Sequence, residues 1–441
     1  MLFKKAPNGR YMMKFGAAKV VTTPPFKMKL ACSGKMDVDY EDIYDDVYAR
    51  CLVFDNGENK FILMSFDLLF HDRSLNNAIA EYASEKYGVN PQGVCVCYTH
   101  AHTTPASKGY HPMHHDDRYE ELLIERGKQC IDNAMEHMFE GYYEYGSIEI
   151  EMNDSRRALI NGRYQNAPDP NKPHDKELFV IAVKDMEGKI RSVFANYACH
   201  PVFYPAKLTL CGEFPARLCM ELDTMYEGCV SLFSQSAGGD VRPRPVAVKL
   251  DDGTWKWRGG TFEEMEKFGK DLSLLVKSVI DSGKMKRGAS LFEAVQFDIP
   301  LEMYGRSLED FQKLWERWKD DRYGPNRTNA YLISHGGYEK LSDVLPLTCQ
   351  IIRMDEDFFI ATMGGEPCYN VKMIVREVFR DKTLCFVGYT DSCAYIVDDV
   401  MIDEGGYEPT SSLEYGLKGN FKYGIGKKIK DGFANALKEN F

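Results

Sequence analysis

The sequence has 441 residues, of which 44% are hydrophobic and 27% are charged, and its formal net charge is −11 at pH 7. An acidic chain repels phosphate backbones and anionic lipid surfaces, so a nucleic-acid partner and a membrane-surface role are disfavoured. The sequence has no apolar run of about 18 residues and no signal peptide, so we expect a cytoplasmic protein without membrane insertion, whose 13 cysteines are reduced thiols.

Strands and helices are predicted to alternate from end to end. A β-hairpin is predicted over 48–68, around the turn Asp55-Asn56-Gly57, and a helix over 74–88, with Ser74 as its cap and Gly88 as its end. Further helices are predicted at 117–139, 213–226, 262–281, 307–320, 369–379 and 412–438, and further strands at 93–99, 147–152, 178–184, 191–197, 289–300, 348–353, 357–363 and 384–389.

This alternation predicts an α/β (mixed α+β) fold with large mixed β-sheets flanked by helices. No linker or repeat divides the sequence, so residues 1–441 are predicted to form a single domain. The segment 240–262 is rich in Pro, Gly and Trp. It is predicted to be either a flap over a site or a surface excursion with hairpin character around Asp252-Gly253.

Histidines follow two of the predicted strands. His100 and His102 come directly after the strand at 93–99, and side chains two residues apart in an extended segment point to the same face. His200 follows the strand at 191–197 and precedes a proline that ends the strand. Two strand ends that each deliver a histidine can form half of a zinc site. Taken alone, each histidine could equally be a hydrogen-bonded residue of the core.

Other loops carry further polar candidates. Gly239 and Asp240 follow an apolar strand and could form an oxyanion nest or simply a tight turn. Glu366 precedes the helix at 369–379, where it could ligate a cation or stabilise the helix N-terminus. Tyr395 and Tyr407 lie in later loops, where tyrosines are also common for packing alone.

The order of these segments resembles the neutral (non-lysosomal) ceramidase family. The matching segments are 99–105 (THAHTTP), 196–202 (NYACHPV), 237–241 (AGGDV), 364–367 (GGEP) and 407–409 (YEP). In the family, these places hold a THTHSGP-like segment, a strand ending in histidine, a GDVSPN-like turn, a GEP motif and a paired-tyrosine segment. The resemblance runs from about residue 12 to the C-terminus and covers the catalytic domain, without the C-terminal immunoglobulin-like domain.

The resemblance implies a zinc-dependent hydrolase, a ceramidase-like amidohydrolase. Matched by position, the residues implied to bind Zn²⁺ are His100, His200, Glu366 and Tyr395, while His102 would lie beside the substrate's oxygen and Tyr407 would contact the reacting carbonyl. Zinc lowers the pKa of a bound water to about 7 and polarises a carbonyl. A histidine and a tyrosine hydroxyl can then stabilise the oxyanion or protonate the leaving group.

Arg242 departs from the family pattern, which has a serine at this position of the turn. A mechanism with that serine as nucleophile is therefore excluded. Arginine suits bidentate binding of a carboxylate or phosphate, which predicts that Arg242, with Asp240 and Gly239, binds a small polar or anionic substrate. Equally, Arg242 could pair internally, for instance with Asp154.

Three functions remain open. The leading interpretation is hydrolysis of an amide (or ester) bond of a small-molecule substrate by attack of zinc-bound water. A second keeps the zinc site but makes the protein a phosphoesterase or lactonase. A third, a non-catalytic zinc-containing binding protein, is disfavoured because His102 and Tyr407 are both retained. The loop with His111, His114 and His115 could hold a second metal, but a solvated polar loop is the simpler interpretation. The sequence does not determine the oligomeric state.

Overall fold

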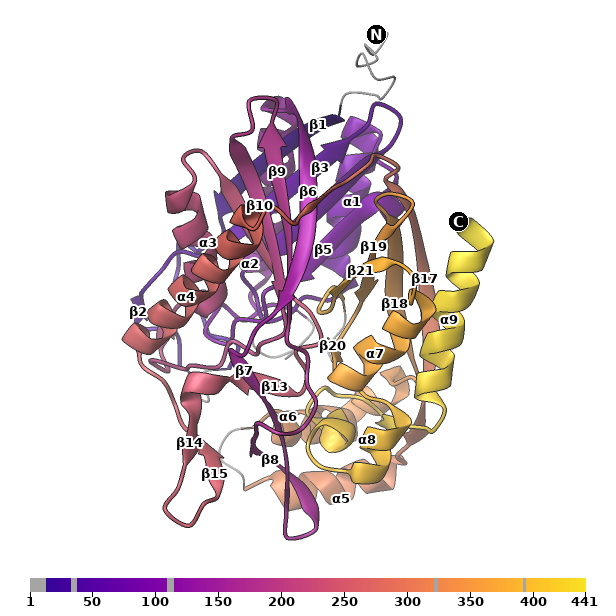
Figure 1. The fold of residues 1–441 in the computed structure, drawn as a ribbon. Helices are drawn as coiled ribbons and strands as arrows, with labels where there is room; N and C mark the ends of the chain where they lie inside the picture. Colours follow the sequence, from indigo (N-terminus) through magenta and orange to yellow (C-terminus); the bar gives the residue numbers. More distant parts are fainter. Residues whose placement is uncertain (1–12, 33–37, 109–114, 321–323, 392–393) are drawn as a thin grey trace.

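The computed structural model describes residues 13–32, 38–108, 115–320, 324–391 and 394–441, which form two packed β-sheets covered by helices (Figure 1). The larger sheet has the strand order β12 (Val230–Gln235), β10 (Ile190–Tyr197), β9 (Glu177–Asp185), β6 (Phe139–Glu149), β1 (Met13–Val21), β3 (Tyr48–Asp55), β4 (Lys60–Phe66) and β5 (Val94–Tyr98), with β16 (Lys286–Arg287) beside β6. The smaller sheet has the order β21 (Thr383–Val387), β19 (Phe358–Met363), β18 (Val344–Arg353), β17 (Glu293–Gly305) and β23 (Gly419–Phe421).

Apolar layers hold the sheets and helices together. Between the sheets, side chains such as Phe54 of β3 and Ile360 of β19 belong to one buried cluster. The outer face of the larger sheet packs against α1 (Arg73–Tyr87), α2 (Asp117–Glu136), α3 (Glu213–Met225) and α4 (Phe262–Asp281), and that of the smaller sheet against α7 (Tyr369–Val378) and α9 (Ile425–Asn440). Where both faces of a strand are covered, as in β4 and β19, the strand is almost continuously apolar. This layering confirms the predicted mixed α/β fold.

Local sequence patterns predicted the ends of several helices correctly. Helix α4 begins and ends at the predicted residues, and α1 is terminated by Gly88, which adopts a left-handed conformation with φ of 64°. The cap of α1 is Asp72, however, whose side chain accepts a hydrogen bond from the amide of Ser74. The predicted cap Ser74 therefore lies inside the helix, because the carboxylate two residues earlier is the better placed acceptor.

Two predicted elements differ from the structure. The strand expected at 147–152 is the end of β6, which begins at Phe139. The helix expected at 412–438 begins only at Ile425, as α9, after a short helical turn and β23. Gly416 and Gly424 both have positive φ, which a continuous helix does not accommodate.

Short elements gather at one end of the two sheets, in the lower part of Figure 1. They are β2 (Asp42–Ile43), β7 (Asn153–Ile160), β8 (Arg163–Asp169), β11 (Thr209–Leu210), β13 (Val241–Pro243), β14 (Ala247–Lys249), β15 (Trp255–Trp257), β20 (Glu366–Pro367), β22 (Tyr395–Ile396), α5 (Leu308–Trp318), α6 (Pro325–Leu332) and α8 (Asp399–Glu404). The β14–β15 hairpin turns at Gly253, as expected for the surface-excursion interpretation of 240–262.

The described cysteines are free thiols, and most of them are buried in the core. Within the described ranges, every helix is too short or too polar to cross a membrane.

Candidate metal centre

Four predicted site residues meet where strands of both sheets end. The Nε2 atom of His100 lies 3.2 Å from Nε2 of His200 and 3.2 Å from Nε2 of His102. The Oε2 atom of Glu366 lies 3.3 Å from Nε2 of His100 and 3.1 Å from Nε2 of His200. His100, His200 and Glu366 are almost completely buried, while His102 is half-buried. The structure thus brings together side chains that are far apart in the sequence.

The hydrogen bonds behind the rings determine which nitrogen atoms face the centre. The Nδ1 atoms of His100 and His200 contact the carbonyl oxygens of Leu69 at 3.0 Å and Gly238 at 2.5 Å. A carbonyl only accepts, so each Nδ1 carries the proton and each Nε2 presents a bare lone pair. The Oε1 atom of Glu366 accepts a hydrogen bond from the Tyr415 hydroxyl at 2.6 Å.

The second carboxylate oxygen, Oε2 of Glu366, is buried and receives no hydrogen bond from any described residue. Two nitrogen lone pairs and an anionic oxygen that converge in this way repel one another unless a cation lies between them. Neutral imidazoles backed by carbonyls, together with one carboxylate, are the donor set that zinc prefers. The residues therefore fit a metal ion, and His102 adds a third imidazole within reach.

Electrostatics keeps these groups in their metal-binding protonation states. Burial and the nearby guanidinium of Arg156 lower the pKa of His200 to about 3. Burial and the other two imidazoles hold the pKa of His102 well below its usual value. Burial alone would raise the pKa of Glu366, but His100 and His200 hold it well below its usual range. These shifts favour neutral imidazoles at His102 and His200 and an ionised carboxylate at Glu366.

Tyr395, the fourth predicted ligand, lies next to Glu366. The two residues are paired in the short parallel ladder of β20 and β22. The Tyr395 ring is stacked against His200, with ring centroids 6.4 Å apart, and is almost completely buried. Burial raises the pKa of Tyr395 well above its usual value, which favours the neutral phenol.

Arg156 is a residue of the centre that sequence analysis missed. It lies on β7, where Nη1 approaches Nε2 of His200 at 3.4 Å and Nε donates to Oε1 of Glu408 at 2.9 Å. Arg157 also donates to Glu408, from the other side. The strand itself was not predicted, because the polar run Asn153–Arg157 is typical of a loop, and no local signal could have identified Arg156.

A pocket of about 290 Å³ opens beside the centre. Its lining includes His102, Arg156, His200, Tyr204, Arg242, Tyr395, Tyr407 and Glu414. The Tyr204 hydroxyl is hydrogen-bonded to Nδ1 of His102, and the Tyr407 hydroxyl donates to Glu414 at 2.8 Å. The backbone of Tyr204 has φ of 51° and its amide donates to the buried carboxylate of Glu213. His102 is therefore held by a tyrosine whose own conformation is fixed from behind.

The turn with Gly239 and Asp240 contacts the protein around Glu366. The Gly239 amide donates to the carbonyl of Pro367 at 3.0 Å, and a Cβ at Gly239 would lie 2.7 Å from the Glu366 carbonyl oxygen. The Asp240 carboxylate accepts from the amide of Tyr369 at 3.0 Å, and burial raises the pKa of this carboxyl to about 7. Neither residue is among the described residues that line the pocket. Their predicted contact with substrate stays a prediction, while their packing against Glu366 is direct.

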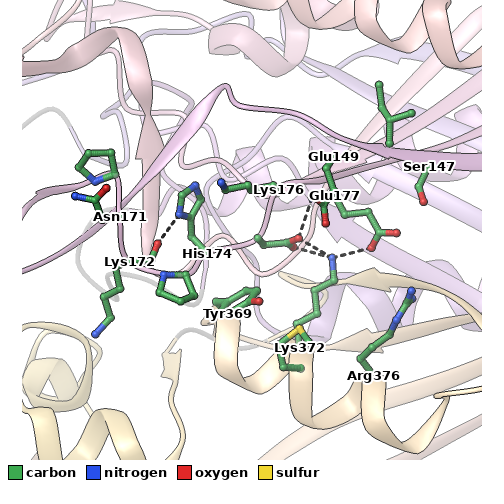
Figure 2. Close-up of a pocket in the computed structure, with 15 residues that line it drawn as sticks. Ser147, Glu149, Asn171, Lys172, His174, Lys176, Glu177, Tyr369, Lys372 and Arg376 are labelled. Atoms are coloured by element: carbon green, nitrogen blue, oxygen red, sulfur yellow. Dashed lines mark hydrogen bonds and ion pairs between the residues drawn. The ribbon is translucent and has the colours of Figure 1, made fainter.

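A buried ion cluster, here called the Lys372 cluster and made of Lys372, Asp175 and Glu177, fastens this region together. Figure 2 shows Lys372 pointing from α7 toward Glu177, and all three residues line a second pocket of about 540 Å³. The Nζ atom of Lys372 lies 2.8 Å from both oxygens of Asp175 and 3.1 Å from Glu177. The Ser236 hydroxyl also donates to Asp175, at 2.6 Å. Asp175 thereby links α7 to the turn whose Gly238 carbonyl orients His200.

Arg242 does not form the internal pair proposed as an alternative. Its backbone pairs with that of Asp154 in the β13–β7 ladder, but the Asp154 side chain binds Arg244 instead, at 2.8 Å. Arg242 lies over the Trp257 ring, with its guanidinium carbon 4.9 Å from the ring centroid. Arg244 lies in the short 3-10 turn that follows β13, where it also reaches Glu151.

In the other histidine-rich loop, His111 and His114 lie outside the described residues. His115 lies 3.5 Å from the carboxylate of Asp117 at the beginning of α2. It does not belong to the metal-binding group found among the described residues.

Comparisons with known proteins identify the fold. No protein-family model matches the sequence, and no curated protein matches it. The structure is similar to neutral ceramidase from Pseudomonas aeruginosa, with a TM-score of 0.72 and 14% identity over 97% of this chain and 75% of that one. It is also similar to a ceramidase complexed with C2, with a TM-score of 0.74 and the same identity and coverage. The chain therefore has the fold of neutral ceramidases, as the sequence resemblance predicted.

Proposed function

We propose that the protein is a Zn²⁺-dependent hydrolase that cleaves an amide or ester bond of a small polar or anionic compound. The observation that carries this proposal is the convergence of two bare imidazole nitrogens and an unpaired carboxylate oxygen beside an open polar pocket. The same fold in ceramidases supports amide-bond hydrolysis as the chemistry, since that is the bond a ceramidase cleaves.

In this proposal, His100, His200, Glu366 and Tyr395 hold the ion. A zinc ion held there would lower the pKa of a water molecule to about 7 and polarise a substrate carbonyl. Tyr395 is suited to the fourth position because it pairs with Glu366 along β20 and β22 and stacks on His200. Arg156 contributes a positive charge next to His200 and keeps that imidazole neutral.

His102 and Tyr407 would act on the substrate. Both line the pocket, so both are accessible to a molecule bound there. The low pKa of His102 keeps it neutral, and its bond to Tyr204 fixes the ring, so that it can accept or return one proton at Nε2. The Tyr407 hydroxyl, whose pKa is raised by burial, can donate a hydrogen bond to a developing oxyanion. In a second arrangement, His102 is a further ligand and Tyr407 alone faces the oxyanion.

Metal analysis tests the proposal first. Purified protein reconstituted with zinc should hold about one ion per chain, and His100→Ala and Glu366→Ala should lose it. His137→Ala is a matched control, because His137 is an exposed histidine at the end of α2. Zinc-free protein with unchanged thermal stability after reconstitution would contradict the proposal.

A substrate panel then identifies the bond. N-acyl, O-acyl, lactone and phosphoester compounds should separate the proposed amide or ester hydrolysis from lactonase and phosphoesterase activity. Turnover of phosphoesters alone would favour the second interpretation, which shares the cationic pocket. A zinc-loaded protein that cleaves none of these compounds would instead be a binding protein.

A further inference from the structure

Arg242 lies in the active-site pocket without a hydrogen bond or ion pair to any described residue. Its Nε atom is buried and unpartnered, although charged groups at such positions are ordinarily paired. The other arginine of the pocket, Arg156, forms an ion pair with Glu408 at 2.9 Å, a carboxylate that it shares with Arg157. Arg242, by contrast, has no ion pair with a described residue.

Trp257 holds the guanidinium in place without consuming its donors. The guanidinium carbon lies 4.9 Å from the centroid of the Trp257 ring, a cation–π contact that uses the charge but none of the N–H groups. Arg242 lies on β13, which pairs with β7, the strand that carries Arg156, and Trp257 lies on β15. The ring contact thus fixes the guanidinium in position, while no described residue takes up its N–H donors.

The acidic side chains near Arg242 are committed elsewhere. The buried Glu213 carboxylate accepts from the backbone amides of Phe203 and Tyr204, and Glu414 accepts from the Tyr407 hydroxyl. Asp154, the backbone neighbour of Arg242, binds Arg244. Burial and the charge of Arg156 also lower the pKa of Arg242 to about 10, and the buried Glu213 carboxyl opposes this shift only in part.

We propose that Arg242 binds a carboxylate of the substrate, so that the substrate class is a small acyl compound bearing a carboxylate, such as an N-acylated amino acid. This inference rests on the proposed function. A guanidinium forms bidentate pairs with carboxylates and with phosphates, but a single guanidinium fully neutralises only the singly charged carboxylate. A pocket of about 290 Å³ suits a small molecule of this kind.

Binding of a non-hydrolysable probe tests the inference without relying on turnover. The probe is an N-alkyl amino acid, with an amine in place of the amide, compared by calorimetry with its carboxamide and its phosphonate. We expect wild-type protein to bind the carboxylate at least tenfold more tightly than the carboxamide, and this preference to vanish in Arg242→Gln. It should persist in the control Arg244→Gln, which removes a neighbouring arginine paired at the surface.

The rate of substrate cleavage provides a second test of the inference. With N-acyl amino acids, Arg242→Gln should lower kcat/KM by roughly 100-fold, because it removes one partner of a desolvated charge pair. The corresponding N-acyl carboxamides should be unaffected, and zinc content should be retained. Arg242→Lys should recover only part of the loss, since lysine lacks the fork of donors.

The outcomes separate the two proposals. Equal binding of carboxylate and carboxamide by wild-type protein, or a preference that survives in Arg242→Gln, would overturn the inference. Tighter binding of the phosphonate than of the carboxylate would also overturn it. If carboxylate binding depends on Arg242 but no acyl compound is cleaved, the inference stands and the proposed hydrolase function fails.

Discussion

The Lys372 cluster offers a direct test of how the fold supports the metal centre. The side chains of Lys372 and Asp175 are 6% and 3% exposed, and that of Glu177 is 21% exposed. Burial would lower the pKa of Lys372, but Asp175 and Glu177 outweigh it and raise the pKa above its usual value. The substitution Lys372→Met removes the charge and keeps most of the apolar side chain.

The expected loss of stability in Lys372→Met follows from the contacts that Asp175 keeps. Asp175 keeps its bonds to Ser236 and to the amide of Glu177, but its charge is left buried and unpaired. Breaking a buried ion pair from one side costs about 3–5 kcal/mol. Because Glu177 is partly exposed and Met retains the packing, we expect a loss near the lower limit, about 3 kcal/mol. Adding Asp175→Asn should recover part of it, since the double variant buries no unpaired charge.

Urea unfolding monitored by circular dichroism measures this loss. Lys176→Met is the matched control, because Lys176 lines the same pocket but pairs with Glu151 where the side chains are 32% and 57% exposed. An exposed pair contributes less than about 1 kcal/mol. The reasoning would be refuted if Lys372→Met lost no more stability than Lys176→Met. Because Asp175 also holds Ser236, near the Gly238 carbonyl that orients His200, zinc affinity should fall in Lys372→Met and not in the control.

Two further predictions concern His71 and Tyr204. Burial opposes protonation of His71, but bonds to Asp72 and Glu120 raise its pKa to about 9, so its charged form stabilises the fold by at most about 3 kcal/mol. This contribution is fully present below about pH 6.5 and is lost as the pH rises through 9. The free energy of unfolding, measured from pH 6 to 10, should therefore fall with rising pH, and His71→Gln should make it less dependent on pH. Tyr204→Phe removes the hydrogen bond to His102 and should lower kcat by roughly tenfold to 100-fold and change its pH profile, with zinc content unchanged. The control is Tyr226→Phe, whose hydroxyl bonds to no described residue, and an equal effect of both variants would contradict a positioning role for Tyr204.

The parts of the site that the sequence predicted are those with local signals. His100 and His200 each end an apolar strand, and that pattern alone placed them at strand ends. It could not place them together, because the 3.2 Å approach of their Nε2 atoms depends on how β5 and β10 are arranged in a sheet of nine strands. Family resemblance supplied the pairing that local pattern lacked.

The parts of the site that the sequence did not predict are polar side chains that are buried against residues far away in the sequence. In β7, the residues from Asn153 to Arg157 are all at most 4% exposed, although each is polar. Sequence patterns identify strands through buried apolar residues, so a polar strand that is buried against charged partners is indistinguishable from a loop. Arg156 was missed for this reason, since its partner Glu408 is 252 residues away. Tyr415, the donor to Glu366, is 49 residues away from it and lies in a segment predicted to be helical.

These departures from local rules are themselves informative, because they cluster. Among the described residues, six that are not glycine have positive φ, and four of them, His100, Tyr204, Glu213 and Tyr389, surround the metal centre. The unpaired oxygen of Glu366, the buried polar strand β7 and the unpaired Arg242 lie in the same region. Each feature costs free energy, and such costs persist where a function requires them. Strain and unsatisfied charge thus locate the same site as the histidines do, on independent grounds. They also distinguish its two halves: under the two proposals, a cation would satisfy the half at Glu366 and an anion would satisfy the half at Arg242.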